Sequence, residues 1–318
     1  MKLPVTACAS LFALRLAAQD TTIRATVPLV VLPTSVTDRH GHSINGLTAS
    51  EFTLLDNATP KPVNIDVIDS DLAPIALVVL IQTSDISLSA LAKIRKVGTV
   101  ISEAVVGGNG EVAVATFNDR VEIIQDFTRD ADEVSKAFVG LEAGDNMGGR
   151  MIDAVDRSMT MLTSRSGPRR SNVLIIGESR DRGSKAKLED LRQRLQRTGV
   201  TIYALKYSAY LTPFTTRPEE YSPTGGSLLT GITELARLGK QNTMEALTGL
   251  TGGMAASFET KAKLEKDLMR VANDIHSRYL VSFVPDGAQI PSFHQISIRI
   301  KGHPDAVIRT RPGYWAGV

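Results

Sequence analysis

Two groups of polar residues follow apolar runs of the chain directly, in the position where ligands collect in parallel α/β sheets. Gln82, Ser84 and Asp85 come after the apolar residues 75–81, and Glu178 comes after residues 171–176. Because the carboxyl ends of parallel strands meet at one edge of a sheet, we expect these side chains to face a shared site. Carboxylates and hydroxyls are ligands for Mg²⁺, and serine or glutamate also serves hydrolysis as nucleophile or base.

The sequence favours a protein without hydrolase activity, and hydrolysis remains the alternative. Ser84 lacks the glycine-flanked elbow and the partnering histidine of a hydrolase triad. No histidine or second carboxylate is placed beside Glu178 by the sequence, so a capping or ion-paired role is the simpler interpretation. We therefore predict a protein that is not an enzyme, with a hydrolase using Ser84 or Glu178 as an alternative.

The elements that position these residues alternate between strand and helix patterns. The run 75–81 has no polar alternation, which is typical of a parallel strand buried on both faces, and apolar residues recur at helical spacing behind it. Further strands are predicted at 111–117, 121–127, 171–176, 200–207 and 254–258, and helices at 130–141, 185–198, 230–250 and 261–277. This order predicts an α/β fold with a parallel central sheet, over residues 72–277.

Two β-rich segments, residues 20–71 and 278–318, flank this α/β domain. Strands are predicted at 23–32, 35–38, 52–55 and 63–68, and again at 279–284, 295–300 and 306–311. Each segment has too few strands to be stable alone, and the termini of a domain usually lie close together. We therefore expect the flanking antiparallel segments to pack into one composite sandwich.

Residues 1–18 have the layout of a secretory signal peptide, with a basic start, an apolar middle and small residues up to Ala18. The expected location is therefore secreted or periplasmic. The only cysteine, Cys8, lies in this segment, so the mature chain has no disulfide, and lipidation of Cys8 stays open. A net charge of +2, from 36 basic and 34 acidic residues, gives no reason to expect nucleic acid as a partner. No apolar run is long enough for a transmembrane segment.

The chain resembles the von Willebrand factor type A family, in particular bacterial, largely acidobacterial, VWFA-related secreted proteins. The resemblance implies a doubly wound, Rossmann-like domain that binds a protein partner through a divalent metal at the strand ends. It rests on short motifs that occur in the family's order: Gly46, Leu47 and Thr48 before Glu51 and Phe52; residues 74–81; residues 115–119; residues 126–128; Gly148 and Gly149 before Asp153 and Ala154; and the terminal Arg311, Pro312, Gly313 and Tyr314.

The metal site that the resemblance implies is degenerate in this sequence. In the family it consists of an Asp-x-Ser-x-Ser elbow, a threonine in a second loop and a late aspartate. These fall on Gln82, Ser84 and Ile86, on Arg150, and on Glu178, so that only Ser84 is unchanged. An alternative register makes Asp85, Ser87 and Ser89 the elbow of a Mg²⁺-dependent adhesion domain, but it needs the first strand to continue through Ser84.

A guanidinium offers no lone pair to a metal, so Arg150 is predicted to replace the ion. We expect Arg150 to pair with Glu178, with Asp85 close by, and Gln82 to be a neutral neighbour. No metal or other cofactor is then needed. Tyr210, Phe214 and Tyr221, in the polar loop 208–227, are further candidates for the binding face. The predicted function is an exported, non-enzymatic protein-binding module.

Overall fold

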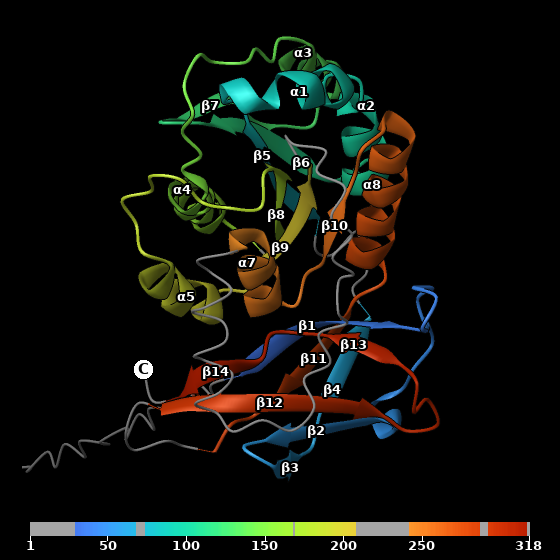
Figure 1. Ribbon diagram of the computed structural model, residues 1–318. Helices are drawn as coiled ribbons and strands as arrows, with labels where there is room; N and C mark the ends of the chain where they lie inside the picture. Colours follow the sequence, from blue (N-terminus) through green and yellow to red (C-terminus); the bar gives the residue numbers. More distant parts are fainter. Residues whose placement is uncertain (1–28, 68–73, 168, 208–241, 287–291, 317–318) are drawn as a thin grey trace, which may run out of the picture.

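The computed structural model describes residues 29–67, 74–167, 169–207, 242–286 and 292–316, which form an α/β unit resting on a β unit (Figure 1). The predicted signal peptide with Cys8 and the loop that carries Tyr210, Phe214 and Tyr221 lie outside these residues.

A six-stranded sheet forms the centre of the α/β unit, in the order β10-β9-β8-β5-β6-β7. All neighbouring strands pair in parallel except β7, which is antiparallel to β6 at one edge. The strands are β5 (Ile75–Gln82), β6 (Glu111–Phe117), β7 (Val121–Thr128), β8 (Arg170–Gly177), β9 (Thr201–Lys206) and β10 (Ala255–Ser257). Every residue of β5 is buried, as its unbroken apolar pattern predicts.

Helices cover both faces of this sheet, so the predicted doubly wound α/β class is confirmed. One face carries α1 (Leu88–Ile94), α2 (Gly98–Val100), the π-helix η3 (Ile101–Val106), α3 (Ala131–Val139) and α8 (Lys261–His276). The other carries α4 (Met151–Thr163), α5 (Leu188–Arg197) and α7 (Thr243–Thr251). The 3₁₀ turn η2 (Asp85–Ser87) joins β5 to α1. No helix in the described ranges is both long and apolar enough to cross a membrane.

The β unit consists of two four-stranded antiparallel sheets with a shared apolar core. Each sheet contains two strands from each end of the chain, and these alternate in the first sheet but not in the second. One sheet has the order β13-β1-β11-β4, with β1 (Val30–Thr37), β4 (Asn64–Val67), β11 (Tyr279–Phe283) and β13 (Val307–Arg309). The other has the order β14-β12-β2-β3, with β2 (Phe52–Asp56), β3 (Thr59–Lys61), β12 (Ser292–Ile300) and β14 (Gly313–Ala316); the turn η1 (Ala49–Glu51) precedes β2.

The first strand of the β unit differs from its prediction. The sequence suggested a break near Pro33, whereas β1 runs without interruption from Val30 to Thr37. Along one edge of β1, residues 30–34 pair with β11. Along the opposite edge, β13 pairs only with residues 35–37 and does not reach Pro33. The missing N–H of the proline is therefore not needed on the β13 side.

The two units meet at the amino-terminal edge of the central sheet. There Asp274 at the end of α8 forms ion pairs with Arg278 and Arg309, both at 2.7 Å. The same carboxylate accepts hydrogen bonds from Ser35 of β1 at 2.5 Å and from Tyr203 of β9 at 2.8 Å. One buried carboxylate thus joins a helix and a strand of the α/β unit to the β unit.

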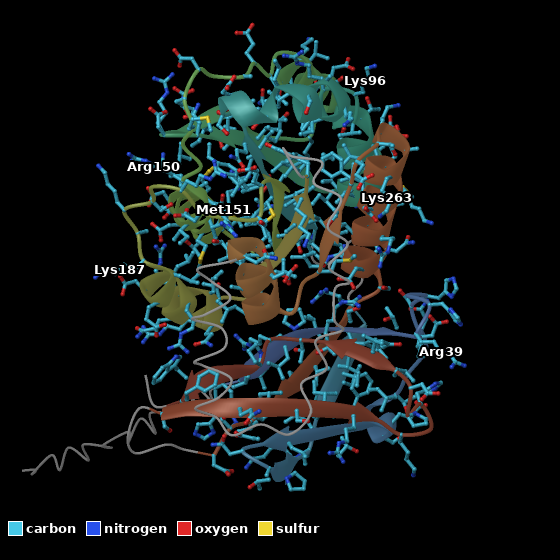
Figure 2. All side chains as sticks on the ribbon, in the orientation of Figure 1. Arg39, Lys96, Arg150, Met151, Lys187 and Lys263 are labelled. Atoms are coloured by element: carbon cyan, nitrogen blue, oxygen red, sulfur yellow. The ribbon has the colours of Figure 1, made fainter. Side chains whose placement is uncertain are left out.

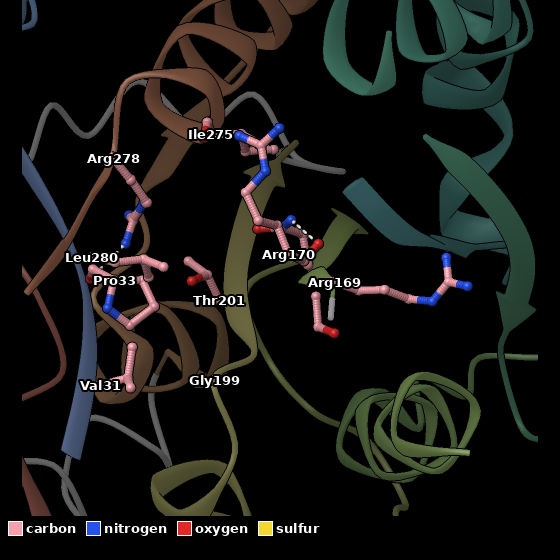
Figure 3. Close-up of a pocket in the computed structure, with 11 residues that line it drawn as sticks. Val31, Pro33, Arg169, Arg170, Gly199, Thr201, Ile275, Arg278 and Leu280 are labelled. Carbon is pink, nitrogen blue, oxygen red and sulfur yellow. Dashed lines mark hydrogen bonds between the residues drawn. The ribbon is translucent and has the colours of Figure 1, made fainter. Parts of the chain in front are cut away.

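A cavity of about 250 Å³ lies beside this junction. It is lined by residues of both units, among them Val31, Thr201 and Leu280, together with three arginines. The arginine side chains do not converge in it: Figure 3 shows Arg169 and Arg170 extending in different directions. Arg278 is engaged by Asp274 and by the carbonyl oxygens of Pro33 and Gly252. The cavity is therefore not an assembled anion site.

Candidate functional site at the carboxyl edge of the sheet

Gln82, the last residue of β5, lies at the centre of the carboxyl edge of the sheet. Its side chain is fully buried. The carboxamide oxygen accepts a hydrogen bond from the backbone N–H of Glu178 at 2.8 Å, and the amide nitrogen donates to Ser84 Oγ at 2.8 Å. A Cβ atom on Gly149 would lie 3.2 Å from this nitrogen, and one on Gly177 would lie 2.8 Å from the oxygen. The carboxamide therefore fills the space between the end of β8 and the loop before α4.

A chain of hydroxyl groups extends this hydrogen bonding toward β9. Ser84 Oγ lies 3.4 Å from Ser87 Oγ, and Tyr207, directly after β9, donates to Ser87 Oγ at 2.6 Å. All three side chains are buried. Burial raises the pKa of Tyr207 well above its usual range, so its hydroxyl stays a donor at neutral pH. The elbow after β5 is therefore tied to the ends of both β8 and β9.

Backbone contacts join the loops that surround Gln82. Gly149 and Arg182 exchange two N–H···O bonds, at 3.0 and 2.8 Å. Asp181 accepts a hydrogen bond from Ile152 N at 3.0 Å, and Asp153 accepts from Ala186 N at 2.8 Å. The start of α4 and the β8–α5 loop thus cap each other. This leaves the loops little freedom to open around an ion.

The structure corrects the predicted partner of Glu178. Its carboxylate lies 3.0 Å from Arg182, four residues later, and not in an ion pair with Arg150. Arg150 stands at the start of α4 beside Met151 (Figure 2), where its side chain forms no hydrogen bond that caps the helix. The Gly149–Arg182 bridge explains the difference, because it places Arg182 beside the strand end that carries Glu178. Asp85 is exposed at the rim.

The groups at this edge do not fit the divalent metal that the family resemblance implies. A Mg²⁺ ion needs several oxygen ligands at about 2.0–2.1 Å in near-octahedral geometry. Here the central group is a carboxamide whose oxygen is engaged by Glu178 N and whose N–H₂ end faces Ser84. An amide nitrogen donates hydrogen bonds and is not a metal ligand. In the described part of the chain, no three His, Cys, Asp or Glu side chains are grouped as a metal site would require.

The alternative register is not supported by the course of the backbone. β5 ends at Gln82, so the strand does not continue through Ser84 as that register requires. Ser89 lies exposed within α1, and Asp85 is exposed, whereas Ser87 is buried against Tyr207. The three side chains therefore do not share one surface, as ligands of a single ion would have to.

Among the described residues, no histidine lies beside Ser84 or Glu178. Ser84 is fully buried and its Oγ accepts from Gln82. All five histidines lie elsewhere: His40 and His42 are in the turn after β1, His276 ends α8, His294 is in β12 and His303 follows β12. His294 is engaged by Asp56 at 2.7 Å within the β unit. No imidazole is placed to activate Ser84 or to assist Glu178.

Three residues that shape the site were not found from the sequence. Tyr207 is the last residue of the predicted strand 200–207, and neither Arg182 nor Asp181 belongs to a predicted site. The one available signal was the cluster of polar residues 177–181 after an apolar run. Their contacts are mainly with backbone groups and hydroxyls of distant segments, for which sequence spacing gives no signal.

Comparison with protein-family profiles and with curated proteins finds no match for this sequence. Similar solved structures include the following three bacterial proteins. The protein BatB of Bacteroides thetaiotaomicron covers 63% of this chain and 98% of its own, with 10% identity and a TM-score of 0.44. A von Willebrand factor type A protein of Catenulispora acidiphila covers 92% and 75%, with 10% identity and a TM-score of 0.45. The vWF domain of the type V pili tip protein Mfa5 of Porphyromonas gingivalis covers 64% and 95%, with 10% identity and a TM-score of 0.40. No residue role follows from likenesses this distant.

Proposed function

We propose that this chain is an exported, non-enzymatic protein-binding module of von Willebrand A type, in which hydrogen bonds replace the metal at the strand-end site. The observation that carries the proposal is the carboxamide of Gln82. It fills the space between the end of β8 and the loop before α4, and both of its polar atoms form hydrogen bonds there. Because this carboxamide takes the space at the strand ends and the Glu178 carboxylate is ion-paired with Arg182, we favour metal-independent binding over metal-dependent adhesion or hydrolysis.

A face suited to a protein partner borders this closed site. Leu88, at the start of α1, is 63% exposed, and Met147, in the loop before α4, is 51% exposed. The two segments are in contact, because Asp85 N donates to the carbonyl oxygen of Asn146 at 2.9 Å. Exposed apolar side chains with a polar rim are typical of interaction surfaces. The exposed Asp85 belongs to this rim.

An affinity-capture experiment tests the proposal. The full chain is immobilised and exposed to a periplasmic or extracellular extract, with and without EDTA. We expect the same partner to be retained in both cases, because no metal is required. Replacing Leu88 and Met147 together by Ser should reduce capture about tenfold or more, as for residues at the centre of an interface.

The matched control is Val307→Ser, which alters an exposed apolar residue of the β unit, 44% exposed, away from this face. Capture should be unchanged in this variant. Loss of capture on addition of EDTA would contradict the proposal, and so would saturable turnover of esters or phosphate esters by the purified chain.

A further inference from the structure

The C-terminal motif that includes Arg311, Gly313, Tyr314 and Trp315 has no part in the proposed binding site, yet it is densely bonded. It occupies the tail segment, residues 310–315, which includes most of β14 at the border between the two units. In Figure 1, α5 and α7 lie directly above β1 and β14. The tail segment is thus placed where it can contact both units.

Arg311 connects the two units through a single guanidinium. It donates to the carbonyl oxygen of Gln196, in the last turn of α5, at 2.7 Å, and to that of Val31, in β1, at 2.7 Å. The residue is only 9% exposed. Burial lowers the pKa of Arg311 to about 10, so the group stays charged at neutral pH. A cation at the carboxyl end of a helix is favoured by the helix dipole.

Trp315 makes a second connection to the same helix. Its indole N–H donates to the side-chain oxygen of Gln196 at 2.9 Å, and its ring packs edge-on against Phe293 of β12 with centroids 5.9 Å apart. Gln196 is itself buried, with 2% of its surface exposed. One glutamine of α5 is thus bonded to the tail segment through both its backbone and its side chain.

Two glycines allow the close approach that these bonds require. A Cβ atom on Gly313 would clash with the carbonyl oxygen of His294 and with the ring of Phe293. Gly252, which ends α7 with a positive φ of 70°, lies directly against the backbone of Thr310. The tail segment therefore lies against the ends of two helices on the same face of the central sheet.

Tyr314 anchors the tail segment from the opposite side. Its hydroxyl donates to the buried carboxylate of Asp56 at 2.7 Å, and its ring packs against Phe283 with centroids 5.7 Å apart. Residues 313 and 315 face away from this core, as alternation along a strand requires. The segment is thus fixed in the β unit by Tyr314 and holds the α/β unit through Arg311 and Trp315.

We infer that the tail segment is a built-in clamp that fixes the α/β unit on the β unit, so that the two move as one body. As a consequence, the face around Leu88 and Met147 has a fixed orientation relative to the β unit. Without such contacts, relative motion of the domains is the general expectation.

Distance measurement between spin labels tests this inference. Cysteines replace Arg39, in the turn after β1, and Lys96, after α1, both exposed and labelled in Figure 2, and Cys8 is changed to Ser in the full chain. We expect one narrow distance distribution in the labelled parent protein. In Arg311→Ala we expect it to broaden about twofold, because only the junction around Asp274 then holds the two units and they regain part of their relative motion.

Trp315→Phe serves as the milder variant, since it removes only the indole N–H, and a smaller broadening is expected. Arg299→Ala, an exposed arginine on the neighbouring strand β12, is the control and should leave the distribution unchanged. Circular dichroism establishes that each variant is folded. A distribution as narrow in both Trp315→Phe and a folded Arg311→Ala as in the parent protein would overturn the inference, as would a broad distribution in the parent itself.

Discussion

Replacing Asp274 by Asn is expected to lower the free energy of unfolding by about 3–5 kcal/mol at pH 7, the usual cost of removing one partner from a buried ion pair. The carboxylate is 97% buried and receives Arg278, Arg309, Ser35 and Tyr203. Arg278 is buried as well, so the variant leaves its charge without a counter-ion. Chemical denaturation of the two proteins at equal concentration measures the difference.

The effect should depend on pH with a definite sign. Burial by itself would raise the pKa of Asp274, but Arg278, Arg309 and the hydrogen bond from Ser35 lower it, and the net pKa lies well below the usual range. A carboxyl group with a depressed folded-state pKa contributes stability above its unfolded pKa, about 3.9, and loses that contribution as the pH falls. The difference between parent and variant should therefore be full at pH 7 and shrink steadily below about pH 4.

Glu265→Gln, in the same helix, is the matched control. Glu265 pairs with Lys261, both side chains are more than a third exposed, and the expected cost is below about 1 kcal/mol. Equal losses of unfolding free energy in Asp274→Asn and Glu265→Gln, or a loss in Asp274→Asn that does not change between pH 7 and pH 3, would show that Asp274 does not hold the junction as an ion pair.

Replacing Gln82 by Ala is the second change with a large expected effect, about 3–5 kcal/mol of unfolding free energy, comparable to truncation of a buried residue of this size. The variant empties the space between Gly149 and Gly177 and leaves the N–H of Glu178 without its acceptor. Thermal and denaturant unfolding measure the loss. Amide exchange at Glu178 should also become faster.

Gln82→Met separates the cost of the empty space from the cost of the lost hydrogen bonds, because methionine keeps most of the side-chain volume and removes only the polar atoms. We expect it to cost about 1–3 kcal/mol, the range for a buried donor left unsatisfied. If both variants were as stable as the parent, Gln82 would not be the group that closes the site.

The fold follows from local patterns to a large extent. The run 75–81 has no polar alternation, so its place in the interior of a parallel sheet was predictable, and the strand at 111–117 was predicted with the bounds it has. The β unit was less accessible, since pairing of β1 with β11 joins residues at opposite ends of the chain. Only two general arguments pointed to it, the instability of isolated strands and the closeness of domain termini.

The details of the site were less predictable, for a physical reason. Gln82 bonds to a backbone N–H 96 residues later, and every residue except proline carries such a group. Sequence therefore suggested a charged partner for Glu178 but not which arginine, and Arg150 was chosen where Arg182 is the neighbour. The short backbone bridge between Gly149 and Arg182 places Arg182, and not Arg150, beside Glu178. The spacing of the residues in the sequence does not indicate this bridge.

The most direct test of the closed site is the melting temperature of the full chain in Mg²⁺, in Mn²⁺ and in EDTA. A competent site with a dissociation constant of ~0.1 mM would gain about 2.7 kcal/mol in ~10 mM Mg²⁺. In a protein of this size that raises the melting temperature by roughly 5–10 °C. With Gln82 filling the site, we predict the same melting temperature in all three conditions, to within about a degree. A reproducible rise of several degrees with Mg²⁺, reversed by EDTA, would contradict the account.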